Sequence, residues 1–378
     1  MKKNFIPDIV ISGSGVWTPP HIITNAELVD SYNAYAKKFN AENADAIETG
    51  KIQEKFPSSE RFIQKASGIK NRFVYEKEGI LDINRMCPKF PERHEDELSN
   101  QAEIALKAAH LAMKAANKTA LDIDAVIVAC AYTQRAYPAI AIEVQNELGI
   151  NGFAFDMMGA CSAATFGLHR AYDCIASGAA RCVLAINPEL VTPQVNYCDR
   201  DTHFIFGDVS TAMILERSET CTSENSFDIL STRALTQFSN NIRSNFGHIS
   251  RATDAQPYGW DKLFHQAGRK VFEEVSPIAS DHIKKHLSDE DIKASDVKKY
   301  WLHQANINMN KMVVKNLLST SLDDNRVPTI LDTFANTASA GSIIAFHYHN
   351  QELKKDDIGV ICSFGAGYSV GSLVLKKR

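Results

Sequence analysis

The chain has 378 residues, of which 44% are hydrophobic and 23% are charged, and its formal net charge is −4. This length exceeds a single compact core and favours two domains or one duplicated domain. The near-neutral charge balance excludes a strong electrostatic attraction to nucleic acid or to an anionic membrane, and the composition is that of an ordinary globular protein.

The eight cysteines are dispersed, with no Cys-x-x-Cys pair and no zinc-type Cys/His spacing. This pattern predicts free thiols in a reducing compartment and no metal site. Near the N-terminus the only apolar run is short, at residues 9–11, and Ser12-Gly13 interrupts it. Such a run is neither a signal peptide nor a membrane span, so we expect a cytoplasmic protein.

The first predicted element is a buried strand at residues 9–12, which Gly13-Ser14-Gly15 is expected to close. A nucleotide site is not predicted there, because the third glycine is missing and Pro19-Pro20 follows instead of a helix. Residues 24–48 carry apolar side chains at helical spacing and predict one amphipathic helix. Irregular patterns at 48–59 and 76–97 predict loops.

Strands and helices then alternate along the chain. In the first half we predict helices at 99–116, 139–148 and 165–178, and strands at 126–130, 153–156 and 181–187. In the second half we predict strands at 228–235, 300–302 and 358–363, and helices at 262–285 and 308–318. Alternation of this kind predicts βαβ units around a mostly parallel, covered sheet.

An internal repeat supports a duplicated α/β fold. Residues 122–129 match residues 296–303, and residues 156–164 match residues 332–340 at nearly the same spacing. A polar segment that begins near residue 217 separates the two halves. In this alignment Cys161 corresponds to Thr337.

Cys161 is the candidate nucleophile. It lies among small residues, between a predicted strand and a predicted helix, where free backbone N–H groups and the helix dipole favour a thiolate. The pseudo-twofold of a duplicated fold would bring it together with His303, at the end of a strand, and with Asn336. Each of these residues has a plainer interpretation: an inert buried cysteine, a core histidine and a helix cap.

Several motifs carry a family resemblance that spans nearly the whole chain. They are Ala-Cys161-Ser-Ala-Ala, Phe206-Gly-Asp, His303-Gln-Ala-Asn306, Asn336-Thr-Ala-Ser-Ala-Gly and Ser363-Phe-Gly365-Ala-Gly367-Tyr. Together they resemble the β-ketoacyl-ACP synthase III family of thiolase-fold enzymes. The stretch between residues 30 and 98 further resembles a longer branch of that family, which includes β-ketodecanoyl-ACP synthases primed by medium-chain acyl-CoA.

The resemblance implies an α/β, thiolase-like fold in which duplicated βαβαβαββ halves form a five-layer α-β-α-β-α sandwich. The N-terminal half, residues 1–217, would carry the cysteine and an insertion at about 30–98. The C-terminal half, residues 227–378, would carry the histidine and the asparagine.

The implied enzyme is an acyltransferase of fatty acid biosynthesis. Cys161 would take an acyl group, of medium length such as octanoyl, from acyl-CoA, and malonyl-ACP would then lose carbon dioxide and attack the thioester. His303 and Asn336 would donate hydrogen bonds to the enolate. The N–H of Cys161 and that of a glycine, Gly365 or Gly367, would form an oxyanion hole. No cofactor and no metal are implied, and the pair His347-x-His349 lacks an evident third ligand.

Other positions follow from the same resemblance. Arg200 and Phe62 would stack on the CoA adenine, with Phe62 standing where the family usually has tryptophan. Asn306 would bind substrate. Ala66 replaces an arginine common in the family, so the contacts to CoA must differ in part.

Protein partners are implied as well. Tyr137 would reach across a homodimer into the neighbouring acyl pocket. Acyl carrier protein is acidic, and Lys311 and Lys315 would dock it in place of the usual arginine, although a solvated helix face explains these lysines equally well.

Two rival functions remain at this point. A condensing enzyme for a specialised metabolite, such as a quinolone or a polyketide starter, would share the three central residues. A papain-like cysteine hydrolase also uses Cys, His and Asn in this order, but its Cys-Gly-x-Cys-Trp signature is absent. The sequence fixes neither the primer length nor the choice between malonyl-ACP and malonyl-CoA, because pocket depth depends on how Tyr137, Met157, Met158 and the insertion pack.

Overall fold

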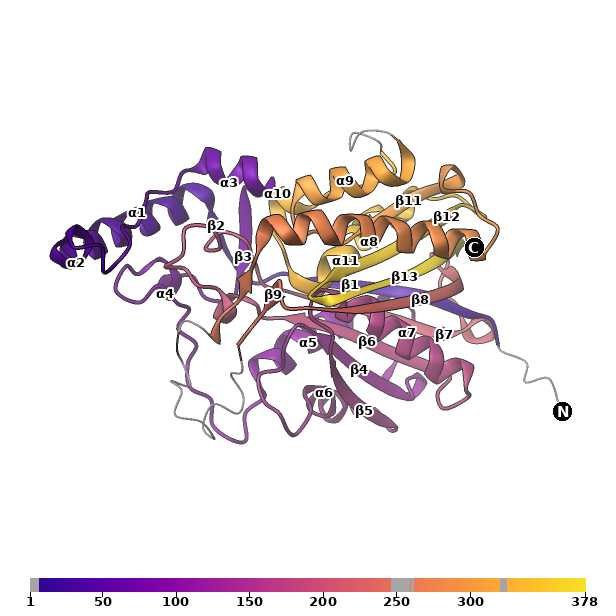
Figure 1. The fold of residues 1–378 in the computed structure, drawn as a ribbon. Helices are drawn as coiled ribbons and strands as arrows, with labels where there is room; N and C mark the ends of the chain where they lie inside the picture. Colours follow the sequence, from indigo (N-terminus) through magenta and orange to yellow (C-terminus); the bar gives the residue numbers. More distant parts are fainter. Residues whose placement is uncertain (1–6, 246–258, 260–261, 320–324) are drawn as a thin grey trace.

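A computed structural model describes residues 7–245, 259, 262–319 and 325–378, and every structural statement below refers to these residues. Their main feature is a nine-stranded sheet of order β11-β12-β13-β8-β1-β7-β6-β4-β5 (Figure 1). Its strands are β1 (Ile9–Trp17), β4 (Ala125–Cys130), β5 (Phe153–Met158), β6 (Cys182–Glu189), β7 (Val209–Arg217), β8 (Phe227–Ser239), β11 (Val297–Leu302), β12 (Ile358–Gly365) and β13 (Gly367–Lys377).

Short strands and helices complete the described chain. The short strands pair as β2 (His21–Thr24) with β3 (Asn71–Val74), and as β9 (Ile242–Arg243) with β10 (His265–Gln266). The α-helices are α1 (Asn25–Glu42), α2 (Ala44–Glu48), α3 (Glu60–Ser67), α4 (Glu78–Leu81), α5 (Asn100–Ala115), α6 (Ile140–Leu148), α7 (Ala163–Ala176), α8 (Gly268–Asp289), α9 (Ile307–Leu318), α10 (Leu331–Phe334) and α11 (Gly341–His349).

The strand order shows the duplication. The N-terminal half runs β1-β7-β6-β4-β5, and the C-terminal half runs β8-β13-β12-β11 with the same sequence of antiparallel, antiparallel and parallel pairings. Within the sheet, the two halves join through two residue pairs between β1 and β8, Val10 with Asp228 and Ile11 with Phe227. The boundary itself, between residues 217 and 227, stays a prediction.

Hydrophobic packing produces five layers. Alternate residues of β4 face opposite sides of the sheet: Ala125 and Ile127 pack toward α7, and Val126 and Val128 pack toward α5. Helices α7 and α11 form the central layer between the two halves of the sheet, whereas α5 and α6 cover one outer face and α8 and α9 the other. This is the α-β-α-β-α sandwich that the resemblance implied.

The repeat has a different register from the predicted one. A one-turn 3₁₀ segment, η2 (Ala160–Ser162), precedes α7, and its counterpart η8 (Ala338–Ala340) precedes α11. Both segments begin at an alanine with positive φ, 45° at Ala160 and 49° at Ala338. Cys161 therefore corresponds to Ser339 and not to Thr337, because the loop before η8 is longer than sequence matching indicated.

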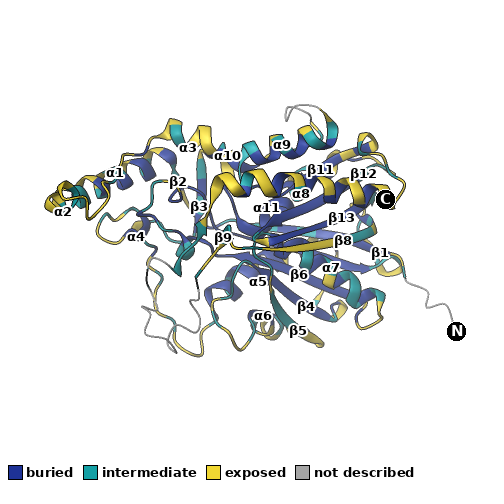
Figure 2. Ribbon diagram, viewed as in Figure 1, coloured by how far each residue is buried: buried dark blue, intermediate teal, exposed yellow. Residues whose placement is uncertain are grey.

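Two expectations near the N-terminus were wrong. Strand β1 is not closed at the glycines but continues to Trp17, since Gly13 and Gly15 allow α5 to pack against it; a Cβ at Gly13 would lie 2.5 Å from the carbonyl oxygen of Ala112. The helix predicted at 24–48 divides at Asn43 into α1 and α2. Figure 2 shows that the segment formed by α1 and α2 ends in the exposed helix α2, in contrast to the buried sheet.

Among the described helices, none has the combination of length and apolar character needed to cross a membrane.

Candidate active site

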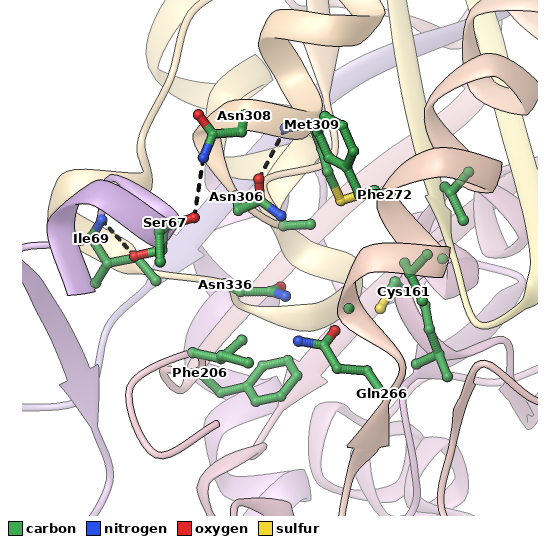
Figure 3. A pocket seen from close by; sticks show the side chains of 18 of the residues that line it. Ser67, Ile69, Cys161, Phe206, Gln266, Phe272, Asn306, Asn308, Met309 and Asn336 are labelled. Atoms are coloured by element: carbon green, nitrogen blue, oxygen red, sulfur yellow. Dashed lines mark hydrogen bonds between the residues drawn. The ribbon is translucent and has the colours of Figure 1, made fainter. Parts of the chain in front are cut away.

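A cavity of about 440 Å³ lies where the two halves meet the insertion. Cys161, His303 and Asn336, which come from three distant segments, all line it. In Figure 3 the amide of Asn336 points across the pocket toward the side that carries the Cys161 sulfur. Phe62, Asn306 and Gly365 also line this cavity, so the structure brings most of the predicted site residues together.

Cys161 sits in η2, just before α7, as the predicted strand-to-helix junction requires. Burial, however, raises the pKa of its thiol to about 11, against the lowering effect of the N–H groups of Ala366 and of Cys161 itself. The expectation that this position favours a resting thiolate was therefore wrong, because desolvation of the charge outweighs the backbone dipoles. The thiol has to lose its proton as it reacts.

Gly365 ends β12 directly against the cysteine. A Cβ at this position would lie 2.4 Å from the Cys161 Cβ and 2.9 Å from its Sγ, so only glycine leaves space for the thiol. The second N–H that faces the sulfur belongs to Ala366 and not to a glycine. Gly367 begins β13 and lines neither this cavity nor the smaller cavity on the other side of the thiol.

His303 follows β11, and its backbone N–H donates to the carbonyl oxygen of Cys362 at 2.8 Å. Burial lowers the pKa of the imidazole to about 3, so the ring is neutral. Its Nδ1 is buried and has no hydrogen-bond partner among the described residues. An N–H there would lack an acceptor, so the hydrogen is better placed on Nε2, where the ring lines the cavity. His303 is thus suited to donate a hydrogen bond and not to store a positive charge.

Three polar groups of Asn336 form hydrogen bonds with neighbouring backbone: its N–H, its carbonyl oxygen and its side-chain Oδ1. Its backbone N–H donates to the carbonyl oxygen of Ile205 at 3.0 Å, and its own carbonyl accepts from the N–H of Gly207 at 3.1 Å. Its side-chain Oδ1 accepts from the N–H of Ala338 at 3.0 Å. The helix-cap interpretation was wrong, because Thr337 and not Asn336 is the N-cap of η8, and Oδ1 closes a local turn instead. This bond leaves the amide NH₂ as the group that faces the cavity.

A second cavity of about 130 Å³ also borders Cys161. It shares Phe206 and Phe264 with the first cavity, and its wall also includes Ala131 and Tyr132. Sequence reasoning missed Phe264, Ile242 and the polar Gln266 of the first cavity, which carry no motif. It quoted Phe206 only as part of a motif.

Arg200 does not line the cavity itself but contacts Phe62, which does. The guanidinium carbon lies 3.9 Å from the centre of the phenyl ring, and Nε donates to the carbonyl oxygen of Pro57 at 2.8 Å. The two faces expected to stack on adenine are thus stacked on one another and must separate to admit a ring. Asn306 lines the cavity and also caps α9, since its Oδ1 accepts from the N–H of Met309 at 2.9 Å (Figure 3).

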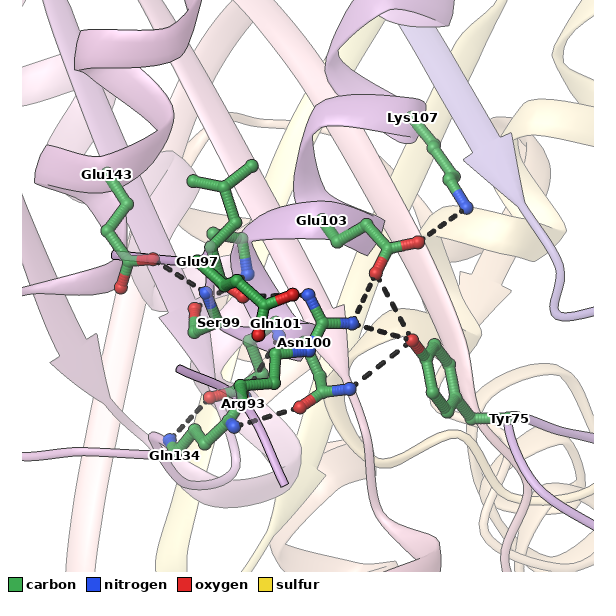
Figure 4. A network of polar contacts seen from close by, with 12 residues as sticks. Tyr75, Arg93, Glu97, Ser99, Asn100, Gln101, Glu103, Lys107, Gln134 and Glu143 are labelled. Atoms are coloured by element: carbon green, nitrogen blue, oxygen red, sulfur yellow. Dashed lines mark hydrogen bonds and ion pairs between the residues drawn. The ribbon is translucent and has the colours of Figure 1, made fainter. Parts of the chain in front are cut away.

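The remaining predicted residues lie away from the thiol. Lys311 and Lys315 are exposed on α9. Tyr137 is 85% exposed and lines neither cavity. Its loop is anchored at one end by Gln134, whose backbone N–H donates to Gln101 Oε1 at 2.5 Å, within a network of polar contacts around the start of α5 (Figure 4).

The described residues contain no cluster of three or more His, Cys, Asp or Glu side chains that could hold a metal ion. His347 instead contacts the Ser14 hydroxyl at 2.9 Å, and His349 contacts Glu352 at 2.6 Å. All eight cysteines are free thiols, as predicted.

The chain is similar in sequence to 3-oxoacyl-[acyl-carrier-protein] synthases of the type III family. Residues 155–237 match the model of 3-oxoacyl-[acyl-carrier-protein] synthase III, and residues 287–377 match the model of its C-terminal part. The chain is 51% identical over 350 residues to the β-ketodecanoyl-[acyl-carrier-protein] synthase of Pseudomonas aeruginosa, covering 93% of this chain and 100% of that protein. It is 28% identical to the β-ketoacyl-[acyl-carrier-protein] synthase III of Ehrlichia canis, covering 97% and 98%.

Solved structures share the fold. The 3-oxoacyl-[acyl-carrier-protein] synthase III of Aquifex aeolicus superposes with a TM-score of 0.75 at 24% identity, covering 97% of this chain and 99% of that one. The priming β-ketosynthase of the R1128 polyketide pathway superposes with a TM-score of 0.78 at 19% identity, covering 100% and 98%. At these identities the structural likeness establishes the fold alone.

Proposed function

Because this chain belongs to the β-ketoacyl-[acyl-carrier-protein] synthase III family, we propose that it condenses an acyl-CoA primer with malonyl-ACP to give β-ketoacyl-ACP in fatty acid biosynthesis. The observation that carries the proposal is the convergence of Cys161, His303 and Asn336 on one cavity. The papain-like hydrolase interpretation is wrong, since the family is that of a condensing acyltransferase.

In the first half-reaction, Cys161 attacks the thioester carbonyl of acyl-CoA. The new bond joins Sγ to the acyl carbon, the bond from that carbon to the CoA sulfur breaks, and the thiol proton ends on the released CoA. The negative charge that develops on the carbonyl oxygen is stabilised by the backbone N–H groups of Cys161 and Ala366, which already face the sulfur. No resting thiolate is required.

In the second half-reaction, malonyl-ACP loses carbon dioxide and leaves an enolate. The neutral imidazole of His303 and the amide NH₂ of Asn336 donate hydrogen bonds to its oxygen. Burial of His303 suits this task, because a hydrogen-bond donor in a site without bulk water acts more strongly than one in solvent. The enolate carbon then attacks the acyl carbon, and Cys161 leaves as a thiolate that takes a proton from solvent.

We assign a medium-chain primer such as octanoyl to the smaller cavity beside Cys161. The wall there is mainly apolar, with Ala131, Val191 and Phe206 among its residues. Each methylene buried in such a wall contributes about 0.8 kcal/mol. The 51% identical relative is a β-ketodecanoyl-[acyl-carrier-protein] synthase, and that product length supports a primer two carbons shorter than decanoyl. A specialised-metabolite primer would compete for the same cavity.

Acyl carrier protein is the second partner in this proposal. Lys311 and Lys315 are exposed one helical turn apart on α9, whose capping residue Asn306 lines the cavity mouth. Two lysines at this place offer complementary charge to an acidic carrier. They are the docking residues we assign.

We further propose a homodimer that forms through β5. This strand ends the sheet, with only β4 as a neighbour among the described strands. It carries apolar side chains on the surface, with Phe153 38% exposed and Met158 62% exposed, and the nearby Ile142 on α6 is 46% exposed. An unprotected apolar edge strand favours pairing with a second copy. Tyr137, exposed on the adjoining loop, would then reach the partner.

The division of roles has a direct test. His303→Ala and Asn336→Ala should still acquire an acyl group on Cys161 from octanoyl-CoA, but malonyl-ACP decarboxylation should fall by about 10²-fold or more in each. Intact-protein mass and release of labelled carbon dioxide measure the two steps. Loss of acylation in both variants would contradict the division.

A further inference from the structure

A buried carboxylate, Glu189, lies between the two halves of the site and has no part in the reaction described above. It ends β6, and its side chain is fully buried. Its Oε1 and Oε2 accept from the N–H of Ala131 at 3.2 and 3.1 Å, and Oε1 also accepts from the N–H of Ser339 at 3.2 Å and from the Ser339 hydroxyl. Among the described residues, no cation contributes to the pKa of Glu189.

The duplication relates the contact between Glu189 and Ser339 to the contact between Gly365 and Cys161 in the other half. Ser339 is the counterpart of Cys161, and β6 and β12 hold equivalent places in the two halves, so Glu189 at the end of β6 is the counterpart of Gly365 at the end of β12. In the N-terminal junction a glycine leaves space for a reactive thiol. In the C-terminal junction a carboxylate fills that space and binds a hydroxyl.

The junction that Glu189 holds is the one that carries Asn336. The chain turns sharply on both sides of Asn336, with Ala335 at φ 58° before it and Ala338 at φ 49° after it. Positive φ at alanine costs roughly 1 kcal/mol or more and persists only where surrounding contacts hold it. The Ala338 N–H fixes the Asn336 side chain, and the next residue, Ser339, is fixed by Glu189. Any movement of Ser339 is therefore transmitted to the amide that faces the cavity.

The other donor to Glu189 belongs to the acyl pocket. Ala131 follows β4 and lines the smaller cavity beside Cys161. One carboxylate thus joins the wall of the primer cavity to the turn that presents Asn336. Burial raises the pKa of Glu189 to about 7, because the hydrogen bonds from Ser339 and Ala131 only partly offset the loss of solvent around the charge.

We infer that Glu189 is a positioning residue for the condensation half-reaction: through Ser339 it fixes the turn that aims the Asn336 amide at the enolate. This inference rests on the proposed function. Glu189 does not touch the reacting atoms, so its loss should affect decarboxylation and condensation and largely spare the acylation of Cys161.

The test is Glu189→Gln, which keeps the shape but replaces one acceptor oxygen by an NH₂ group facing backbone donors. We expect the rate of condensation of octanoyl-Cys161 with malonyl-ACP to fall about tenfold or more. The KM for malonyl-ACP and the rate of octanoyl loading should stay within about threefold of wild type. Ser339→Ala, which removes only the hydroxyl donor, should show the same split with a smaller loss, and the melting temperatures of both variants report stability.

The outcomes separate the two proposals. A condensation rate within threefold of wild type in Glu189→Gln, or equal losses in loading and condensation, would overturn the positioning role. If Glu189→Gln does not fold, the split or its absence in Ser339→Ala decides in the same way. A wild-type enzyme that loads octanoyl but never condenses it with malonyl-ACP would instead contradict the proposed function.

Discussion

Replacing Gly365 by alanine tests how tightly the fold constrains the nucleophile. The added Cβ would lie 2.4 Å from the Cys161 Cβ and 2.9 Å from Sγ, whereas carbon atoms pack at about 3.5 Å. Strand β12 is paired along both edges, by β11 and β13, so it cannot move away and the cysteine has to shift by about 1 Å. A shift of that size costs roughly 10²-fold in rate.

The assay for Gly365→Ala is the rate of octanoyl transfer from octanoyl-CoA to Cys161, followed by intact-protein mass. Overpacking should also lower the free energy of unfolding by about 1–3 kcal/mol, which thermal unfolding measures. Gly50→Ala is the control, because Gly50 has a φ of +69° but no atom within 4 Å of its Cβ position. It should lose about 1 kcal/mol of stability and keep the wild-type rate. Wild-type acylation in Gly365→Ala would refute the packing argument.

Three further predictions follow from other parts of the molecule. Charge reversal at Lys311 and Lys315 together should raise the KM for malonyl-ACP about tenfold and leave octanoyl loading unchanged; an unchanged KM would refute the docking assignment. Phe153→Lys on β5 should convert a dimer to a monomer in analytical ultracentrifugation, whereas Leu230→Lys, at an exposed apolar position on β8, should not; a dimer in both would exclude the β5 interface. Burial lowers the pKa values of His282 and His286 from 6.5 to about 4, so the unfolded chain binds protons that the folded chain does not, and stability should fall as pH drops from about 6.5 toward 4. A flat stability profile over that range would contradict the burial of these rings.

Periodicity and motif order predicted the alternation of strands and helices, but the expectation of a mostly parallel sheet was wrong. Five of the eight strand pairings in the nine-stranded sheet are antiparallel. The alternation of strands and helices placed β4, β5 and α6 within a few residues of their observed bounds, because continuous apolar runs and Ala-rich helical faces are local signals. Cys161 stood out for the same reason, since a run of small residues between a strand and a helix is visible without knowledge of the tertiary structure.

The features that could not be predicted from the sequence depend on contacts between distant segments. The register of the repeat was wrong by two residues, because loop length before η8 is not a property of the matched residues. The pKa of Cys161 was expected to be lowered, whereas burial among residues from both halves raises it. The direct stacking of Arg200 on Phe62 likewise depends on packing across 138 residues of chain and leaves no local pattern.

The central claim is that Cys161 carries the acyl group of a medium-chain primer. The most direct measurement is the intact mass of the protein after mixing with octanoyl-CoA, with acetyl-CoA or with no donor, beside a Cys161→Ala control. We expect an octanoyl adduct that is absent in the control and is discharged by malonyl-ACP. An acetyl adduct alone would contradict the medium-chain assignment, and an adduct that persists in Cys161→Ala, or none from either donor, would contradict the assignment of the nucleophile.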